Sequence, residues 1–159
     1  MKMTARISPM LWFDGKAEDA ANFYMSIFQN SRITAIMRCG DNGPAPKGSV
    51  LTVGFELDGI PFTALNGGPM YKFTEAISLV IRCDNQAEVD YYWERLLDGG
   101  TTQACGWLKD RYGLSWQIVP VRLIELMTDP NPERAGRVMQ AMMKMIKIDI
   151  PTLEAAAAG

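Results

Sequence analysis

Apolar residues change their spacing several times along the first half of the chain, and these changes predict the elements. A short apolar run at residues 7–13 ends at the turn pair Asp14-Gly15, which is typical of a buried strand. Apolar residues then recur at the i, i+3, i+4 and i+7 positions that line one face of a helix. These are Ala20, Phe23, Tyr24, Ile27 and Phe28. Three stretches rich in β-branched and apolar residues then predict three strands, at residues 32–39, 50–57 and 60–65.

The same order is predicted a second time after the linker at residues 67–69. Residues 77–83 predict a strand, and Asn85 predicts a helix cap because Glu88 follows three residues later. The apolar faces of the two helices match at one fixed offset of 69 residues, which indicates an internal duplication. The matching pairs are Phe23/Tyr24 with Tyr92/Trp93 and Ile27/Phe28 with Leu96/Leu97. Further strands at residues 101–106, 107–111 and 114–119 complete a second βαβββ order.

The last part of the chain has the spacing of helices. We predict helices at residues 123–127 and 132–146, and we expect the alanine-rich tail at 153–159 to fray. The apolar face of the longer helix is rich in methionine, which is typical of a core or a subunit interface. The pattern therefore predicts one α+β domain over residues 1–159, with a first module at 5–68, a second at 75–120 and a helical extension at 121–159.

Composition and charge narrow the classes of partner. A chain of 159 residues with 16 basic and 18 acidic side chains has a net charge of -2 and no basic stripe, so we expect no nucleic-acid partner. No stretch reaches the ~20 apolar residues of a membrane span, so we expect no membrane partner. Cys39, Cys83 and Cys105 are odd in number and form no CxxC pair, which favours reduced thiols in a cytoplasmic protein.

Several stretches together with the tandem βαβββ order carry a resemblance to a known family. They are SPMLWFDG at residues 8–15 leading into 20–28, FTALNGGP at 62–69, CGWLKDRYGLSWQ at 105–117 and KIDI at 147–150. The chain resembles the vicinal oxygen chelate superfamily of glyoxalases, bleomycin-resistance proteins and extradiol dioxygenases. Within it the chain is similar to the PhnB-like branch, also labelled 3-demethylubiquinone-9 3-methyltransferase-like. The resemblance implies two half-open sheets that enclose a cavity, and frequent homodimers.

The resemblance also implies where a metal ion would be held, on the first and fourth strands of each module. By strand order and parity these positions are Ser8, Ala64 or its same-face neighbour Asn66, Ser78 and Gln117. None of them is a histidine or a carboxylate, and the chain contains no histidine at all. Hydroxyls and neutral amides bring no charge to offset the dehydration of a divalent ion. We therefore expect a pocket without a metal ion or another cofactor.

Two kinds of residue in the implied cavity are candidates for ligand contact. An unpaired amide at Gln117, in an otherwise apolar strand, would cost about 1 to 3 kcal/mol, so we expect it to bond either to a ligand or to a neighbouring strand. Ser8 and Ser78 lie on matching first strands and have the same two interpretations. Trp12 and Trp116 are interpreted either as cavity walls or as ordinary core. The complete set of pocket candidates is Ser8, Trp12, Ala64, Asn66, Ser78, Trp116 and Gln117.

A loop and a charged hairpin each have more than one interpretation. The loop at residues 40–48 is either a lid over the pocket or a passive connection. Asp110 and Arg111 lie on an amphipathic hairpin, where we expect them to pair with each other or with a partner subunit on a solvated face.

Three functions are consistent with the sequence. The leading hypothesis is metal-independent binding or conversion of a small, partly apolar organic molecule. The second is a metal-dependent lyase, isomerase or dioxygenase with Gln117, Asn66 and Glu75 as unorthodox ligands. The third is a non-catalytic homodimer that works through its methionine-rich C-terminal helix. Methyl transfer from S-adenosylmethionine is not indicated, because Gly67-Gly68 precedes Pro69 and no GxGxxG turn is present.

Overall fold

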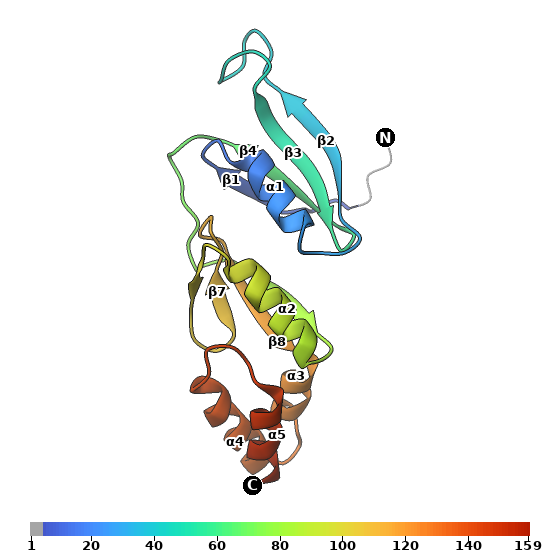
Figure 1. The fold of residues 1–159 in the computed structure, drawn as a ribbon, viewed down its shortest axis with the longest axis vertical. Helices are drawn as coiled ribbons and strands as arrows, with labels where there is room; N and C mark the ends of the chain where they lie inside the picture. The colour runs from blue at the N-terminus through green and yellow to red at the C-terminus, as the bar shows by residue number, and fades with distance from the viewer. Residues whose placement is uncertain (1–4) are drawn as a thin grey trace. The chain divides into compact units, whose positions relative to one another are not determined.

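The computed structural model describes residues 5–159 and confirms the α+β class with two βαβββ modules followed by helices (Figure 1). The chain divides into two compact units, Met1–Lys72 and Phe73–Gly159. Each unit contains one four-stranded sheet, and the second unit also contains the C-terminal helices. No helix within residues 5–159 is long and apolar enough to cross a bilayer.

The first module is one mixed sheet covered by one helix. Its elements are β1 (Met10–Phe13), α1 (Ala17–Met25), β2 (Arg32–Arg38), β3 (Val50–Leu57) and β4 (Ile60–Asn66). The sheet has the order β1-β4-β3-β2, with β1 parallel to β4 and the other pairs antiparallel. Alternate residues of the sheet are buried on the face that packs on α1 (Figure 1). They include Leu11, Phe13, Val53, Phe55, Phe62 and Ala64.

Two boundaries in this module differ from the sequence prediction. The first strand begins at Met10 rather than at residue 7, and Ser8 is exposed ahead of it. Pro9 has no N–H for the ladder, and only its carbonyl pairs, as the acceptor of the Thr63 N–H at 3.0 Å. The helix ends at Met25, so Ile27 is buried from the turn that follows the helix and not from its face.

The second module repeats this arrangement. It contains β5 (Ser78–Cys83), α2 (Gln86–Leu97), β6 (Thr101–Thr102), β7 (Trp107–Lys109) and β8 (Ser115–Pro120), and its sheet has the order β5-β8-β7-β6. The predicted cap of α2 is confirmed, because the Asn85 side chain accepts the Glu88 N–H at 2.9 Å. Strands β6 and β7 are shorter than predicted. The chain leaves the β conformation between them, with φ of 61° at Cys105 and 81° at Gly106.

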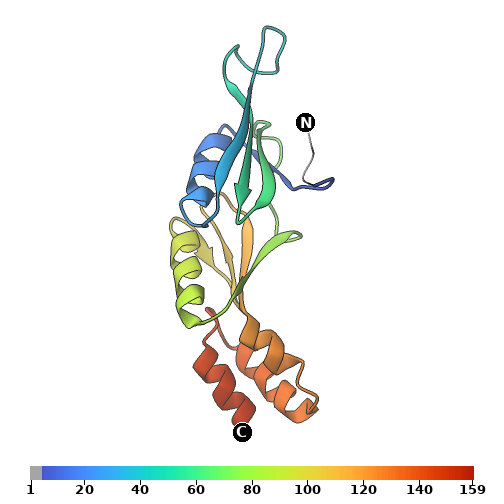
Figure 2. The ribbon, with the colours of Figure 1, turned by 90° about the vertical axis from the view of Figure 1, so that its right-hand side faces the viewer.

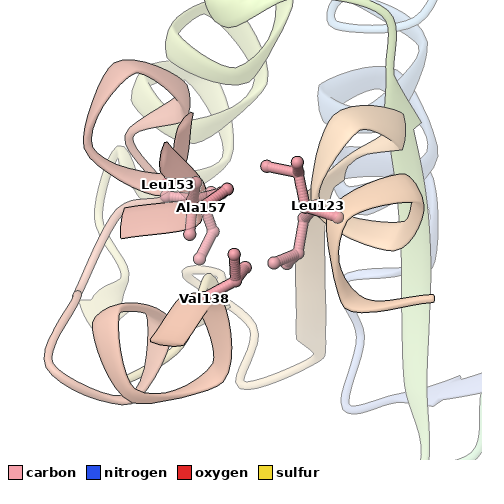
Figure 3. Close-up of a cluster of buried hydrophobic side chains, with 6 residues drawn as sticks. Leu123, Val138, Leu153 and Ala157 are labelled. Carbon is pink, nitrogen blue, oxygen red and sulfur yellow. The ribbon is translucent and has the colours of Figure 1, made fainter. Parts of the chain in front are cut away.

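Three helices, not two with a frayed tail, follow the second sheet. They are α3 (Val121–Met127), α4 (Pro132–Met143) and α5 (Ile150–Ala158). The expected fraying is wrong because Asp149 caps α5 by accepting the Thr152 N–H at 3.0 Å, and because Leu153 is fully buried. Figure 3 shows the apolar side chains of the three helices directed toward one another. The buried members of this cluster are Leu123, Leu126, Val138, Ile148, Leu153 and Ala157.

The cysteines are free thiols, and their environments predict different reactivities. Cys39 and Cys83 are buried, whereas Cys105 is partly exposed. Burial, aided by the charges of Glu88 and Asp84, raises the pKa of Cys83 from 9.0 to about 12. Only the thiolate is nucleophilic, so we expect iodoacetamide at about pH 8 to modify Cys105 first and to leave Cys83 intact in the folded protein.

Mass spectrometry of the alkylated peptides measures this order of reaction, with urea-unfolded protein as the control in which all three thiols react. Modification of native Cys83 as fast as Cys105 would contradict the expected order.

The raised pKa of Cys83 also has a consequence for stability. The contribution of the neutral Cys83 thiol to the stability of the fold is present below pH 9.0 and is lost as the pH rises toward about 12.

Candidate functional site

The sheet of the second module has one face packed on α2 and an opposite face with polar residues. Trp116 and Ile118 of β8 are buried on the side of α2, whereas Val80 of β5, on the opposite face, is 46% exposed. Figure 2 shows α2, in yellow, along one side of this sheet. Strand register places the opposite-face residues in two rows. One row is Ser78, Ser115 and Lys109, and the next is Val80, Gln117 and Trp107. We refer to these six residues as the polar face.

Gln117 and Ser78 form a hydrogen-bonded pair in the polar face. The Gln117 Nε2 donates to the Ser78 Oγ at 2.9 Å, so Gln117 has the bond to a neighbouring strand that its burial requires. Ser78 still has its hydroxyl proton to donate, and the Gln117 Oε1 accepts no hydrogen bond from residues 5–159. The pair therefore keeps one donor and one acceptor, side by side, beyond its own hydrogen bond.

Ser115 and Trp107 complete the surroundings of this pair. Ser115 is fully buried, and its Oγ has no hydrogen-bond partner within the described part of the chain. Trp107 is half-buried and lies directly across from Gln117 in the β7–β8 ladder. Val80, Trp107, Lys109 and Ser115 are not among the pocket residues predicted from the sequence. Val80 and Ser115 share a face of the sheet with Gln117 because they are paired with it or lie two residues from it. Trp107 and Lys109 share that face only through the register of β7 with β8, which cannot be predicted from the three residues of β7.

Glu75 and Lys109 close one end of the polar face with an ion pair. The Lys109 ammonium contacts the Glu75 carboxylate, and the Gln103 Nε2 donates to the same carboxylate at 3.4 Å. The bond from Lys109 holds the pKa of Glu75 below its usual range, so the carboxylate is charged at neutral pH. The charge of the Glu75 carboxylate is therefore balanced by the Lys109 ammonium.

Trp116 belongs to the core and not to the polar face, which is one of the two interpretations that its sequence position left open. Its indole Nε1 donates to Asp110 Oδ2 at 2.9 Å. Asp110 is only 3% exposed, and its Oδ1 accepts the N–H groups of Tyr112 at 2.8 Å and Leu114 at 3.1 Å. The expected solvated Asp110 is therefore wrong, because its carboxylate closes the β7–β8 turn from inside. Arg111 pairs with Asp98 at 2.9 Å.

The candidates of the first module have structural partners or lie apart. Asn66 uses both ends of its amide, because Oδ1 accepts the Ala17 N–H at 2.9 Å and Nδ2 donates to the Val50 carbonyl at 3.0 Å. It thus satisfies one of the open N–H groups at the start of α1. Ala64 is fully buried on the α1 face of the sheet, and Ser8 is exposed before β1. Ala64 therefore has no exposed surface on this sheet, and Ser8 lies outside the strand on which it was predicted.

Trp12 lines a groove of about 470 Å³ in the first module. Its Nε1 donates to the Gly68 carbonyl at 2.8 Å, and its ring meets that of Tyr71 edge to face at 4.9 Å. Gly67 packs against the ring so closely that an added Cβ would lie 2.3 Å from it. Pro44 and Ala45 of the predicted loop form the other wall. The structure thus places Trp12 as a fixed, partly exposed wall.

The repeated βαβββ order, with a helix packed on each sheet, is that of the vicinal oxygen chelate fold, and solved structures share it. FosX, a fosfomycin resistance protein from Listeria monocytogenes, aligns with a TM-score of 0.54 at 15% identity and covers 75% of this chain and 93% of its own. Protein PA1353 from Pseudomonas aeruginosa aligns with a TM-score of 0.61 at 22% identity over 74% of this chain and 98% of its own. These similarities show the fold.

The family follows from closer matches. The PhnB protein from Bacillus cereus is 35% identical, with a TM-score of 0.67, over 73% of this chain and 99% of its own. The sequence model of the 3-demethylubiquinone-9 3-methyltransferase family matches residues 5–119. The chain therefore belongs to this family, the PhnB-like branch of the vicinal oxygen chelate superfamily. A comparison with curated proteins gave no match.

The residues of this chain do not fit the divalent metal ion that the fold implies. One FosX structure contains Mn(II). At the positions where the sequence predicts that a metal ion would be held, Ser78 and Gln117 are neutral and bonded to each other, and Asn66 has both amide atoms bonded. Within residues 5–159, no group of three or more Cys, Asp or Glu side chains is placed to hold a metal ion. The donor set lacks the charge that binds such an ion.

Proposed function

We propose that the protein binds a small, partly apolar organic molecule on the polar face of its second module, without a metal ion. The observation that carries the proposal is the Gln117–Ser78 pair, which keeps one acceptor and one donor available beside Trp107 and Val80. Ligand sites in proteins combine apolar walls with a few convergent polar groups in this way. The expected ligand therefore has an apolar body and one group, such as an amide, an alcohol or a protonated acid, that both donates and accepts.

The buried Ser115 hydroxyl supports this position. A polar group that is removed from water without a partner costs about 1 to 3 kcal/mol. The Ser115 hydroxyl lies between Ser78 and Lys109, where it can form a further hydrogen bond with a polar group of the ligand or with a water molecule bound beside the ligand. We propose the same cytoplasmic homodimer that the sequence analysis expects.

The other two functions have less support. A metal-dependent lyase, isomerase or dioxygenase would need Gln117, Asn66 and Glu75 as ligands, and each of them already has a protein partner. Methyl transfer, which the family name describes, is not proposed, because the turn from β1 into α1 has the single glycine Gly15 in place of a GxGxxG sequence. A purely non-catalytic dimer leaves the polar face without a role.

Replacing Gln117 with alanine tests the proposal. We expect small amides, alcohols and acids with aromatic or branched bodies to include binders of the untagged, EDTA-treated protein. The variant removes the acceptor and frees the Ser78 hydroxyl, so the affinity for those binders should fall about tenfold, the equivalent of one hydrogen bond. Ligand-observed NMR with the same fragments measures both proteins.

The matched control is Gln140→Ala, the same substitution on the exposed side of α4. It should bind every fragment as the parent protein does. Equal affinities for the parent and Gln117→Ala, with both proteins folded, would show that Gln117 is a structural residue only.

A further inference from the structure

The helices α3, α4 and α5 lie beyond the part of the chain that the family defines. The family match ends at residue 119, and the PhnB protein from Bacillus cereus is covered over 99% of its length by 73% of this chain. The extension has its own apolar cluster (Figure 3). An added cluster that only stabilised itself would need no specific hydrogen bonds to the loops and helix of the second module.

The connection between α4 and α5 bonds to the turn between β6 and β7. The Met145 carbonyl accepts the Cys105 N–H at 2.9 Å, and the Ile146 carbonyl accepts the Gly106 N–H at 2.8 Å. Cys105 has a φ of 61°, which is unusual for a residue other than glycine and costs energy unless neighbours hold it. The extension thus fixes a turn conformation that the turn alone does not favour.

This turn is joined directly to the polar face. The Gly106 carbonyl accepts the Ile118 N–H at 2.8 Å, next to Gln117, and Trp107 is the residue after Gly106. Ile148 of the extension fits so closely that a Cβ added at Gly106 would lie 2.9 Å from its Cγ1. A displacement of the extension would therefore move the backbone that carries Trp107.

Gln86, at the start of α2, clamps the extension in place. Its Nε2 donates to the Ile148 carbonyl at 3.0 Å, and its Oε1 accepts the Ile150 N–H at 2.8 Å. Gln86 also donates to Asp90 at 3.0 Å, and Asp90 pairs with Lys147 at 2.8 Å. The segment 147–150 is thus held at both its backbone and its side chains.

We infer that residues 145–150 are a brace that holds the β6–β7 turn and thereby sets the position of Trp107 beside Gln117. Gln86 is the positioning residue that anchors the brace. The inference rests on the proposed function, because Trp107 is an apolar wall of that site. The extension then acts on ligand specificity through backbone geometry, without touching the ligand.

Substitution of Gln86 tests the brace in the full chain without any ligand. In Gln86→Ala we expect the amide hydrogens of Cys105 and Gly106 to exchange about tenfold faster, because their carbonyl partners are less firmly held. In protein labelled with 5-fluorotryptophan, the Trp107 resonance, assigned from Trp107→Phe, should shift or broaden. Trp12, in the first module, is the internal reference and should not change.

Gln86→Glu is the second variant, since it keeps the size of the side chain but cannot donate to the Ile148 carbonyl. Gln140→Ala is the control and should leave all four tryptophan resonances in place. Unchanged exchange at Cys105 and Gly106, or faster exchange with an unchanged Trp107 resonance, would overturn the brace. Failure of the proposed function is read separately, from fragment binding to Gln117→Ala.

Discussion

Replacement of Asp110 with alanine is expected to lower the free energy of unfolding by about 3 to 5 kcal/mol. The carboxylate is almost fully buried and accepts three hydrogen bonds, from the Tyr112 and Leu114 N–H groups and from the Trp116 indole. The alanine variant leaves these donors without an acceptor in a site that water does not reach. Chemical denaturation followed by circular dichroism measures the loss.

One further variant removes the charge of Asp110 alone, and another removes an exposed carboxylate for comparison. Asp110→Asn keeps one acceptor oxygen and should lose less stability than the alanine variant. Asp98→Ala, which removes the exposed partner of Arg111, should cost less than about 1 kcal/mol. A loss at Asp110 no larger than that at Asp98 would mean that the Asp110 hydrogen bonds do not hold the β7–β8 turn.

Gly100→Ala is the second substitution with a large expected effect. A Cβ at this position would lie 2.1 Å from the Lys109 carbonyl oxygen and 3.0 Å from the Asp110 Cα, and both are backbone atoms that cannot turn aside. The β6–β7 pairing must then open, and we expect a loss of about 2 to 4 kcal/mol, or a failure to fold. Thermal unfolding measures this change.

Gly136→Ala provides the matched control with the opposite sign. Gly136 lies in α4, and an added Cβ meets no atom within 4 Å. Alanine should therefore stabilise the helix by about 0.5 to 1 kcal/mol. Equal effects of the two alanine substitutions would contradict the packing described for β6 and β7.

The order of elements could be predicted because it depends on local patterns. The two sheet-covering helices, the Asn85 cap and the strand at 50–57 follow from residue spacing, and all of them are confirmed, although Ile27 and Phe28 lie beyond the end of the first helix. The start of β1 and the short β6 and β7 could not be predicted from spacing. They depend on which backbone groups find partners, and the partners of Cys105 and Gly106 lie about 40 residues further along the chain.

The site shows the same division between local and long-range information. Gln117 is a single polar residue in an apolar strand, which predicts that its amide has a partner, and its bond to Ser78 confirms this prediction. Asn66 and Trp116 have the same polar or aromatic character, but their partners Ala17 and Asp110 make them structural. The type of a buried polar residue predicts that it has a hydrogen-bond partner, whereas the fold decides which residue of the chain that partner is.

Direct observation of the Gln117 side chain during binding tests the central claim. The measurement is the NMR signal of the Gln117 amide in isotope-labelled, untagged, EDTA-treated protein, titrated with the tightest fragment. The account predicts a saturable shift of this signal without any added metal. No shift in EDTA, followed by binding when Mn(II) or another divalent ion is supplied, would contradict it and would indicate a metal site.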